Sequence, residues 1–327
     1  MTMNSIPAPM WTEATHAVQS ANRLLLVTHV EPDGDAIGSM LGLGLALRAL
    51  GKTVDVAVDG GVPSYLRYIP GSDTVLEKLK TGAWDVMISL DSSDEARTGD
   101  CGAYGRANSP VVINLDHHQS NTGFGHIHLV NAAAVSATEV VQDWLPYLGQ
   151  PLTPDIATAL MTGLVTDTIG FRVSSVQPRT LLLAAALMQA GAPMYDIIQR
   201  TLNSKDFRDI QLWQQALPSV TLQDGVISGV VRVADWKAVG MDDTTDSGLV
   251  GYLITTDEAR VAVVYKEKVS GEVEVSLRSK PGYDVSTVAF ELGGGGHKQA
   301  SGATVPGPVD EAIARVAPLL LAIANPQ

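Results

Sequence analysis

The chain has 327 residues, which is enough for two ordinary domains or one large one. An apolar fraction of 45 % with 17 % charged residues excludes a disordered chain and indicates a protein with a substantial core. The net charge of −13 argues against a broad electrostatic grip on duplex DNA, which needs many Lys and Arg contacts to phosphate. A small phosphorylated substrate remains compatible with this charge, because bound metal ions reverse the local sign.

The sequence shows no segment that would place the chain in or across a membrane. No apolar run approaches the roughly 20 residues that cross a bilayer. The N-terminus lacks a basic patch followed by an apolar core, so we expect no signal peptide. Cys101 is the single cysteine, which rules out an internal disulfide. We therefore expect a cytoplasmic protein without a membrane partner.

Strand and helix patterns alternate along the first part of the chain. Buried strands are predicted at 23–30, 53–58, 86–90 and 111–115, and helices at 35–50, 136–148, 155–166 and 179–189. This alternation predicts an α/β domain at 1–191, with a mostly parallel sheet and helices on both faces. An N-terminal amphipathic helix is expected to expose His16, and Cys101 is expected in a glycine-rich loop.

The pattern changes in the second part of the chain. Residues 192–222 are predicted to form a helical linker. Strands at 226–233, 260–268 and 273–278, with a turn at Ser270-Gly271, predict hairpin character. A glycine-rich loop at 293–296 and a helix at 309–324 complete the chain. We predict a smaller mixed-sheet α/β domain at 223–327.

Acidic and histidine side chains gather where the predicted strands of the first domain end. In open α/β sheets, ligands bind outside the carboxyl ends of the strands, so separate strands can aim side chains at one crevice. One further carboxylate follows the long apolar segment at 156–165. The residues are His29, Asp33, Asp35, Asp91, Asp116, His117, His118 and Asp167.

Four carboxylates in one crevice repel one another unless cations lie among them. Two divalent ions would neutralise the negative charges of Asp33, Asp35, Asp91 and Asp167. Mixed Asp and His ligands suit Mn²⁺ better than Mg²⁺, which prefers oxygen and water, although Mn²⁺, Co²⁺ and Mg²⁺ share ligands. A metal pair stabilises both the attacking and the leaving oxygen of a phosphoryl displacement.

Each motif also has a simpler structural interpretation. Asp35 would cap the following helix, and a histidine pair at a strand end would form a hydrogen-bonded loop. His126 and His128 fit no motif and are interpreted as structural. Thr138-Glu139 is interpreted as a helix cap. The joint presence of all the motifs favours a metal centre.

The quoted motifs resemble those of one family. THVEPDGDAIGS, Asp91, the Asp-His-His run at 116–118 and Asp167 resemble the four motifs of the DHH phosphoesterase superfamily. GGGGHKQASG at 293–302 resembles the glycine-rich signature of its DHH-associated C-terminal domain. The NrnA-type subfamily is the most similar. This resemblance implies hydrolysis of short RNAs to nucleoside 5′-monophosphates, dephosphorylation of 3′-phosphoadenosine 5′-phosphate (pAp), and a homodimer.

The resemblance also implies roles for the residues of the first domain. Asp91 would bridge two metal ions, and a water between the ions would be the nucleophile. Asp116 would orient a ligand histidine. His118 would contact the scissile phosphate or protonate the leaving group. The implied ligands are His29 and Asp33 for one ion, and Asp35, His117 and Asp167 for the other.

The C-terminal domain is expected to hold the far end of the substrate. Glycines without side chains let a phosphate approach the backbone, and successive N–H groups form an anion nest. In the family, the corresponding Arg and Gly-Gly-Gly-His residues have this function, so a cleft of fixed span would favour short substrates. The candidate binding residues are Arg278, Ser279, Gly294, Gly295, Gly296 and His297.

Other functions are less well supported by the sequence. A pyrophosphatase of this superfamily would carry a basic Ser-Arg-Lys-Lys run, which is absent. A RecJ-type single-strand DNA exonuclease would be longer and more basic. A membrane-bound cyclic-dinucleotide phosphodiesterase would add membrane segments, whereas a soluble enzyme acting on cyclic di-AMP, pApA or pGpG stays open. The complete set of candidate ligands argues against a non-catalytic nucleotide-binding module.

Overall fold

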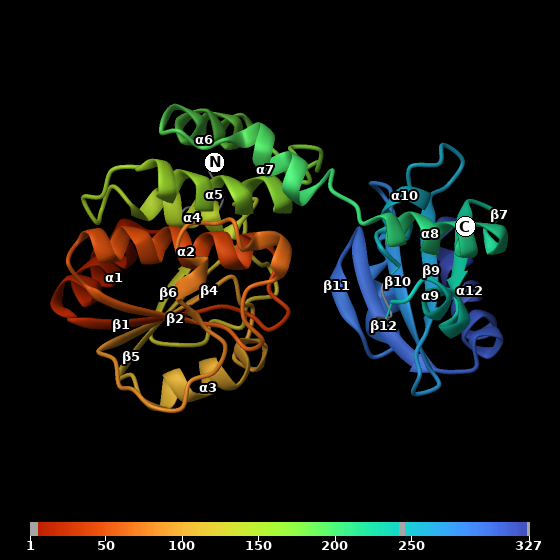
Figure 1. Cartoon of the computed structure of the whole chain (residues 1–327), viewed down its shortest axis with the longest axis horizontal. Helices are drawn as coiled ribbons and strands as arrows, with labels where there is room; N and C mark the ends of the chain where they lie inside the picture. The colour runs from red at the N-terminus through yellow and green to blue at the C-terminus, as the bar shows by residue number, and fades with distance from the viewer. Residues whose placement is uncertain (1–5, 242–245, 326–327) are drawn as a thin grey trace. The chain divides into compact units, whose positions relative to one another are not determined.

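The computed structural model describes residues 6–241 and 246–325. It divides the chain into two units, Met1–Ser204 and Lys205–Gln327 (Figure 1). The boundary falls within the segment predicted as a helical linker. Helix α7 (Met194–Thr201) packs against α5 (Pro154–Asp167) in the first unit, whereas α8 (Phe207–Ala216) belongs to the second.

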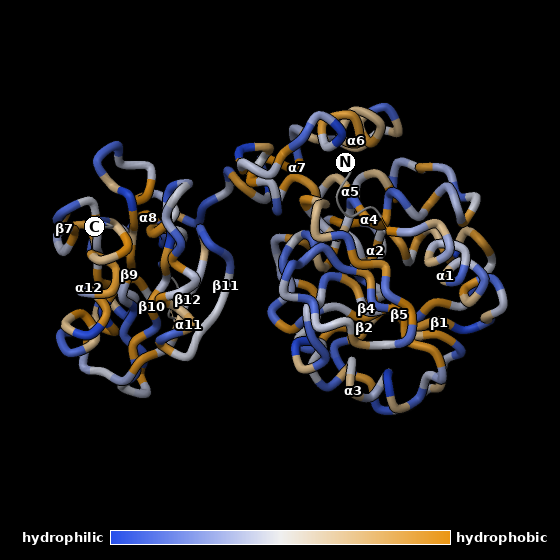
Figure 2. Tube along the Cα trace, turned by 180° about the vertical axis from the view of Figure 1, so that it is seen from behind, coloured by the Kyte–Doolittle hydropathy of each residue, from blue (hydrophilic) through white to orange (hydrophobic). Residues whose placement is uncertain are grey.

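The first unit is built on a six-stranded parallel sheet in the order β3-β2-β1-β4-β5-β6. Residues of β1 and β4 are buried on both faces, as Val- and Leu-rich strands under two helical layers must be. Apolar residues accordingly gather along these strands in Figure 2. The predicted mostly parallel sheet is confirmed. The strands are β1 (Arg23–Val27), β2 (Thr53–Ala57), β3 (Val75–Leu76), β4 (Val86–Leu90), β5 (Val111–Asp116) and β6 (Ile127–Val130).

Helices cover both faces of this sheet (Figure 1). The main core joins one face to α1, α2, α4 and α5, and α6 and α7 pack outside α5. The other face packs against α3 through Leu25, Met87 and Cys101. His16 is exposed on α1, as expected. The bounds not yet given are α1 (Ala8–Ser20), α2 (Gly34–Ala49), α3 (Gly99–Ala107), α4 (Ala137–Trp144) and α6 (Pro178–Gln189).

Cys101 lies in a helix, so its predicted place in a glycine-rich loop was wrong. Gly105 of α3 is a packing residue, whereas Gly99 at the start of the helix has a φ of 61° and belongs to the turn before it. A Cβ atom at Gly105 would lie 2.6 Å from Leu25 Cδ2 and 2.8 Å from Met87 Sδ, so the absence of a side chain lets α3 sit close to the sheet. Cys101 is buried in this contact.

Close packing of α2 against α5 brings the two helices that carry acidic residues together. A Cβ atom at Gly38 would lie 2.5 Å from the carbonyl oxygen of Ala159, and one at Gly163 would lie 2.6 Å from Asp35 Oδ1. These glycines therefore permit a backbone approach that any larger residue would prevent. As a result, Asp35 on α2 and Asp167 at the end of α5 come close to each other.

The second unit contains a six-stranded mixed sheet in the order β11-β12-β10-β9-β8-β7. The β8–β9 pair is parallel and the other pairs are antiparallel. The smaller mixed-sheet domain is thus as predicted. Its strands are β7 (Thr221–Gln223), β8 (Val226–Val231), β9 (Val261–Glu267), β10 (Glu272–Ser279), β11 (Gly295–His297) and β12 (Ala300–Pro306).

Two helical layers cover this second sheet. One core joins it to α11 and α12, and the other joins β8 and β9 to α8, α9 and α10. The glycine-rich segment is an edge strand, β11, and not only the loop that was predicted. A Cβ atom at Gly294 would lie 2.1 Å from the carbonyl oxygen of Gly302, so glycine is required for this strand approach. The helices are α9 (Val233–Ala238), α10 (Leu249–Leu253), α11 (Ser286–Glu291) and α12 (Val309–Ala324).

Among the described residues, no single helix is long and apolar enough to cross a membrane. Taken together, α6 and α7 reach that length and composition, but they are bent by 110° relative to each other.

Candidate metal centre

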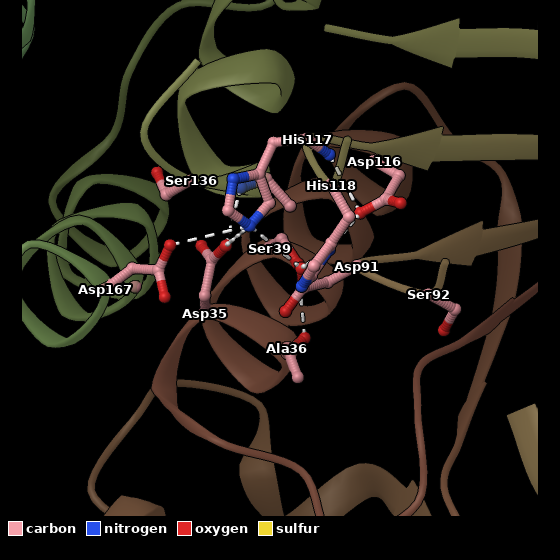
Figure 3. Close-up of polar contacts among 12 residues, drawn as sticks. Asp35, Ala36, Ser39, Asp91, Ser92, Asp116, His117, His118, Ser136 and Asp167 are labelled. Carbon is pink, nitrogen blue, oxygen red and sulfur yellow. Dashed lines mark hydrogen bonds and ion pairs between the residues drawn. The ribbon is translucent and has the colours of Figure 1, made fainter. Parts of the chain in front are cut away.

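The predicted Asp and His residues meet at the carboxyl edge of the parallel sheet. β1 leads to His29, β4 leads to Asp91, and β5 leads to His117. β1 and β4 are neighbours at the point where the strand order reverses, which is where open α/β sheets place their ligand sites. Sequence-distant side chains therefore converge on one place (Figure 3).

Asp33, and not Asp35, caps α2. Asp33 Oδ1 accepts hydrogen bonds from the backbone N–H groups of Asp35 and Ala36, each at 3.0 Å. The simpler interpretation of Asp35 as the cap was wrong. The Asp35 carboxylate instead accepts from the N–H groups of Ala137 at 2.5 Å and Thr138 at 3.0 Å. The N-terminus of α4 thus fixes Asp35 and favours its negative charge.

Asp91 lies between two groups of possible ligands. Its Oδ2 atom is 3.6 Å from His29 Nε2, and His29 Nε2 is 3.9 Å from Asp33 Oδ1. Its Oδ1 atom is 3.4 Å from His117 Nε2. One carboxylate therefore reaches both groups, which is the arrangement that a bridging ligand requires.

His117 lies at the centre of the second group (Figure 3). Its Nε2 atom is 3.5 Å from Asp167 Oδ2 and 3.8 Å from Asp35 Oδ2. Single ligand atoms of these three residues all lie within 4.8 Å of one another, and the same holds for His29, Asp33 and Asp91. The structure thus groups the residues in the same two sets that the family resemblance implies.

Asp116 contacts the ring of His118 and the backbone of His117. Its Oδ1 atom is 2.8 Å from His118 Nδ1 and accepts a second hydrogen bond from the backbone N–H of His117 at 2.8 Å. Asn121 donates to the other carboxylate oxygen at 2.6 Å. Asp116 therefore contacts both the candidate proton donor His118 and the backbone of the candidate ligand His117.

The raised pKa values of two carboxylates indicate that the cluster needs cations to compensate its negative charge. Burial, followed by the charges of Asp91 and Asp167, raises the pKa of Asp35 well above its usual range. Burial and the charge of Asp91 raise the pKa of Asp167 to about 7, although His117 opposes this shift. These carboxylates therefore resist ionising together as long as no cation compensates their charge.

The carboxylates and the histidines of the cluster also shift each other's pKa values. Burial opposes ionisation of Asp91, but the imidazoles of His117 and His29 lower its pKa below the usual range. Burial opposes a charge on His117, and the carboxylates of Asp91, Asp167 and Asp35 raise its pKa in spite of this. Asp91 Oδ1 is buried and accepts no hydrogen bond among the described residues. An anionic oxygen in this state fits a metal ligand.

The ring orientation of His29 also fits a ligand. Its Nδ1 atom is 2.8 Å from the carbonyl oxygen of Val30, so donation at this atom leaves a lone pair on Nε2, which faces Asp91. Arg97 Nη2 lies 3.3 Å from the same Nδ1 atom. The sequence analysis missed Arg97, because an arginine in a short 3-10 turn (Ala96–Thr98) has no distinguishing pattern.

Left-handed backbone conformations surround the cluster. Glu31, Asp91, Ile169 and Phe171 have φ values of 53°, 54°, 49° and 65°. Such values are uncommon for residues other than glycine, and for the β-branched Ile169 they are a clear outlier. Strained residues of this kind gather at functional sites, where the surrounding structure holds them in place.

In the second unit, Arg278 and His297 lie in one row across the sheet. Arg278 on β10 pairs with Ala300 on β12, and Ala300 pairs with His297 on β11. Directly paired residues share a face, and strands are about 4.8 Å apart, so the two Cα atoms are about 10 Å apart. A cavity of 350 Å³ lies further along these strands, lined by Glu274, Gly293, Gly294, Gly302, Ala303 and Thr304, and neither Arg278 nor His297 lines it.

Ser279 is used by the fold. It is buried, and its hydroxyl group donates to the carbonyl oxygens of Tyr283 at 2.6 Å and Lys298 at 3.2 Å. We therefore do not carry Ser279 forward as a substrate contact. Gly294 and Gly296 are required by the strand approach, because a Cβ atom at Gly296 would lie 2.6 Å from the carbonyl oxygen of Ala300.

His126 and Glu139, which were interpreted as structural, have structural contacts, whereas Nε2 of His128 is buried without a hydrogen-bond partner among the described residues. His126 Nδ1 accepts a hydrogen bond from the backbone N–H of Val112 at 2.9 Å. Ser136 caps α4, and Glu139 Oε2 accepts from the N–H of Val135 at 2.7 Å. Glu139 thus takes part in capping this helix, whereas the N-cap residue itself is Ser136 and not Thr138.

Comparisons with known proteins agree with this architecture. The model of the DHH family, N-terminal domain, matches residues 23–164, and that of the DHHA1 domain matches residues 230–322. The chain is 35 % identical over 297 residues to the bifunctional oligoribonuclease and PAP phosphatase NrnA of Thermus thermophilus, covering 90 % of this chain and 87 % of that protein. It is 26 % identical over 298 residues to the protein of the same name from Mycoplasma pneumoniae, covering 90 % of each.

A solved structure, an exopolyphosphatase-related protein from Bacteroides fragilis, has a TM-score of 0.89 at 24 % identity, covering 98 % of this chain and 97 % of that one. At this identity the likeness shows the fold alone. Fold and residue cluster together define a two-domain α/β protein with a candidate metal centre at its sheet edge. The chain belongs to the DHH family, among its NrnA-type members with a DHHA1 domain.

Proposed function

We propose that this protein is a manganese-dependent phosphoesterase that hydrolyses short oligoribonucleotides to nucleoside 5′-monophosphates and dephosphorylates pAp. The observation that carries the proposal is the position of Asp91, whose two carboxylate oxygens face two separate ligand groups. The substrate class is supported by the names of the NrnA relatives, which are called oligoribonucleases and PAP phosphatases.

The donor set fits two divalent ions. His29 and Asp33 would hold one ion, Asp35, His117 and Asp167 would hold the other, and Asp91 would bridge them. Carboxylate and imidazole ligands in this mixture favour Mn²⁺, with Co²⁺ and Mg²⁺ as alternatives. When bound, such ions supply Lewis acidity that activates water and neutralises charge on the phosphoryl group.

His118 is assigned to proton transfer. Asp116 Oδ1 lies 2.8 Å from its Nδ1 atom, which fixes the orientation of the ring. We therefore assign donation of a proton to the leaving oxygen to Nε2 of His118. Asn121 and the backbone of His117 hold Asp116 in turn, so that the pair keeps one orientation.

Residues of the second unit are proposed to bind the end of the substrate that is remote from the scissile bond. The support is that Arg278 and His297 share a face of the sheet, in one row across β10, β12 and β11. A grip of this kind would limit substrate length, because both ends of the substrate are bound. Preference for substrates of a few nucleotides follows from it.

One assay series with Mn²⁺ tests the proposal. It compares an RNA dinucleotide, a pentanucleotide, a long RNA, pAp and cyclic di-AMP at equal concentrations. Fast turnover of the dinucleotide and of pAp, with slow turnover of the long RNA, is expected. Preference for the long RNA would contradict the length limit, and preference for cyclic di-AMP would replace the proposed substrate.

The proposal includes a homodimer in the cytoplasm and no binding of duplex DNA. The net charge of −13 supports the last point. Light scattering of the purified chain measures the oligomeric state, and a monomer at micromolar concentration would contradict the dimer.

A further inference from the structure

An arginine that is not one of the proposed metal ligands lies directly beside His29. Arg97 belongs to the short 3-10 turn Ala96–Thr98, which follows β4 and Asp91 in the chain. Arg97 is exposed, and its Nη2 atom is 3.3 Å from Nδ1 of His29. Since the side chain of His29 is only 5 % exposed, the guanidinium group lies where the buried cluster meets solvent.

Hydrogen bonds fix the backbone of Arg97 next to the cluster. Its carbonyl oxygen accepts a 2.8 Å hydrogen bond from the N–H of Val30, the residue after His29. Its own N–H group donates to Asp94 Oδ1 at 3.0 Å. The following residue, Thr98, is 1 % exposed and anchors the turn in the protein interior. The turn is therefore held beside His29 independently of the Arg97 side chain.

The contact with His29 leaves the hydrogen-bond donors of Arg97 available. Nδ1 of His29 is 2.8 Å from the carbonyl oxygen of Val30, which can only accept, so this nitrogen carries a hydrogen. A protonated Nδ1 cannot accept a hydrogen bond from Arg97. Within the part of the chain that the structure describes, the guanidinium group forms no ion pair with a carboxylate. A cation beside an acidic cluster that does not pair with it can bind an anionic ligand.

The charge of the proposed centre favours a further cation. Two divalent ions would only balance the four candidate carboxylates, which are Asp33, Asp35, Asp91 and Asp167. A bound phosphate group adds at least one negative charge, and the attacking oxygen brings more. A guanidinium group stabilises such charge, and its paired N–H donors match the geometry of two phosphate oxygens.

We propose that Arg97 binds a non-bridging oxygen of the phosphate group at the cluster, in phosphate monoesters and diesters alike. The inference rests on the proposed function for the position of the phosphate. Two other roles differ from it in measurable properties. An ordinary surface arginine would affect neither phosphate nor metal binding, and an arginine that only orients His29 would affect metal binding.

Equilibrium binding tests the contact without requiring turnover. The probe is inorganic phosphate, titrated into the full chain loaded with Mn²⁺ and followed by calorimetry. Arg97→Ala should weaken phosphate binding by roughly 10- to 100-fold, as expected for the loss of charge-assisted hydrogen bonds. Arg97→Lys keeps the charge but loses the paired donors, so its affinity should lie between those of Arg97→Ala and wild type. The number of Mn²⁺ ions per chain, measured by equilibrium dialysis, should be unchanged in both variants.

Arg23→Ala is the matched control. Arg23 is the first residue of β1, so it lies at the opposite edge of the sheet, where it pairs with Asp55 at 3.3 Å. Its phosphate affinity should equal that of wild type. Unchanged phosphate affinity in Arg97→Ala would overturn the proposed contact. A loss of bound Mn²⁺ in Arg97→Ala would also overturn it, because Arg97 would then act by holding His29.

Kinetics separate this inference from the proposed function. Arg97→Ala should lower kcat/KM with both an RNA dinucleotide and pAp, because both substrates place a phosphate group at the cluster. If wild type hydrolyses neither substrate, while phosphate binding still depends on Arg97, the proposed function fails and the contact stands. If wild type hydrolyses both substrates and Arg97→Ala binds phosphate as tightly as wild type, the contact alone fails.

Discussion

Replacing Asp91 by asparagine measures how far the centre depends on one shared carboxylate. Oδ2 of Asp91 lies 3.6 Å from His29 Nε2 and Oδ1 lies 3.4 Å from His117 Nε2, so the substitution removes an anionic ligand from both groups. Asparagine keeps the shape of the side chain. It also tolerates the φ of 54° at this position, so the backbone has no cause to rearrange.

The expected effect is large for both ions. Loss of an outer hydrogen-bond partner of a metal ligand weakens metal binding about 10- to 100-fold, and a direct ligand costs more. We therefore expect Asp91→Asn to weaken the binding of each Mn²⁺ ion by more than about 100-fold. Turnover should fall to below about 1 % of the wild-type rate. Asp33→Asn touches one group only, so one ion should remain bound.

Equilibrium dialysis followed by metal analysis gives the number of Mn²⁺ ions per chain, and turnover of an RNA dinucleotide is measured on the same samples. At a free Mn²⁺ concentration that saturates wild type, Asp91→Asn should hold no ion and Asp33→Asn should hold one. Asp143→Asn is the control, because Asp143 pairs with Arg179 outside the cluster. Full Mn²⁺ content with more than about a tenth of wild-type turnover in Asp91→Asn would refute the bridging role.

Three further predictions concern the grip, the helix packing and the metal-free state. Arg278→Ala should raise KM with little change in kcat, because its proposed substrate contact is remote from the reaction. Steady-state kinetics measures both values, and an unchanged KM would contradict the proposed contact. Gly38→Ala places a Cβ atom 2.5 Å from the Ala159 carbonyl oxygen and should cost about 1–3 kcal/mol in urea unfolding. Gly44→Ala in the same helix meets its nearest atom at 3.4 Å and should be neutral or stabilising, so equal losses would contradict the packing argument. Because the pKa of Asp167 in the folded, metal-free protein is about 7, above its unfolded value, the stability that it contributes is complete below about pH 4 and is lost as pH rises through 7. The melting temperature in EDTA should therefore fall between pH 6 and pH 8, and Mn²⁺ should raise it most at pH 8; a melting temperature that rises over this range would contradict the assignment.

The sequence predicts the positions of most candidate ligands well, because these residues follow strands that are recognisable from their runs of apolar residues. Runs such as Leu24–Leu26 and Val86–Leu90 are readable as buried strands, and the residue after a buried parallel strand must emerge at the carboxyl edge. His29, Asp91 and His117 were located in this way. Asp167 was assigned from the apolar segment before it and from the family resemblance, because the end of a helix alone carries no information about which sheet edge it approaches.

Roles that depend on a hydrogen-bond partner could not be predicted. Asp33 and Asp35 are two residues apart and equally suited to cap α2, and only the contact of Asp35 with α4 separates them. Likewise, Asp116 precedes two histidines, and the chosen ring depends on a side-chain rotamer. Tertiary packing determines these hydrogen-bond partners, and a local sequence pattern carries no information about it.

Glycine was the least reliable signal in the sequence. Gly102 and Gly105 are typical of a loop, yet they lie inside α3, and at Gly105 close packing on the sheet outweighs the poor helix propensity of glycine. Gly295 and Gly296 pair in an edge strand for a similar reason.

Electron paramagnetic resonance of wild type loaded with two equivalents of Mn²⁺ tests the central claim most directly. Two ions bridged by Asp91 would lie roughly 3.5–4 Å apart, so a spin-coupled pair spectrum is expected. The same sample of Asp91→Asn should show mainly unbound Mn²⁺. A spectrum of isolated, magnetically independent Mn²⁺ sites in wild type would contradict the shared centre.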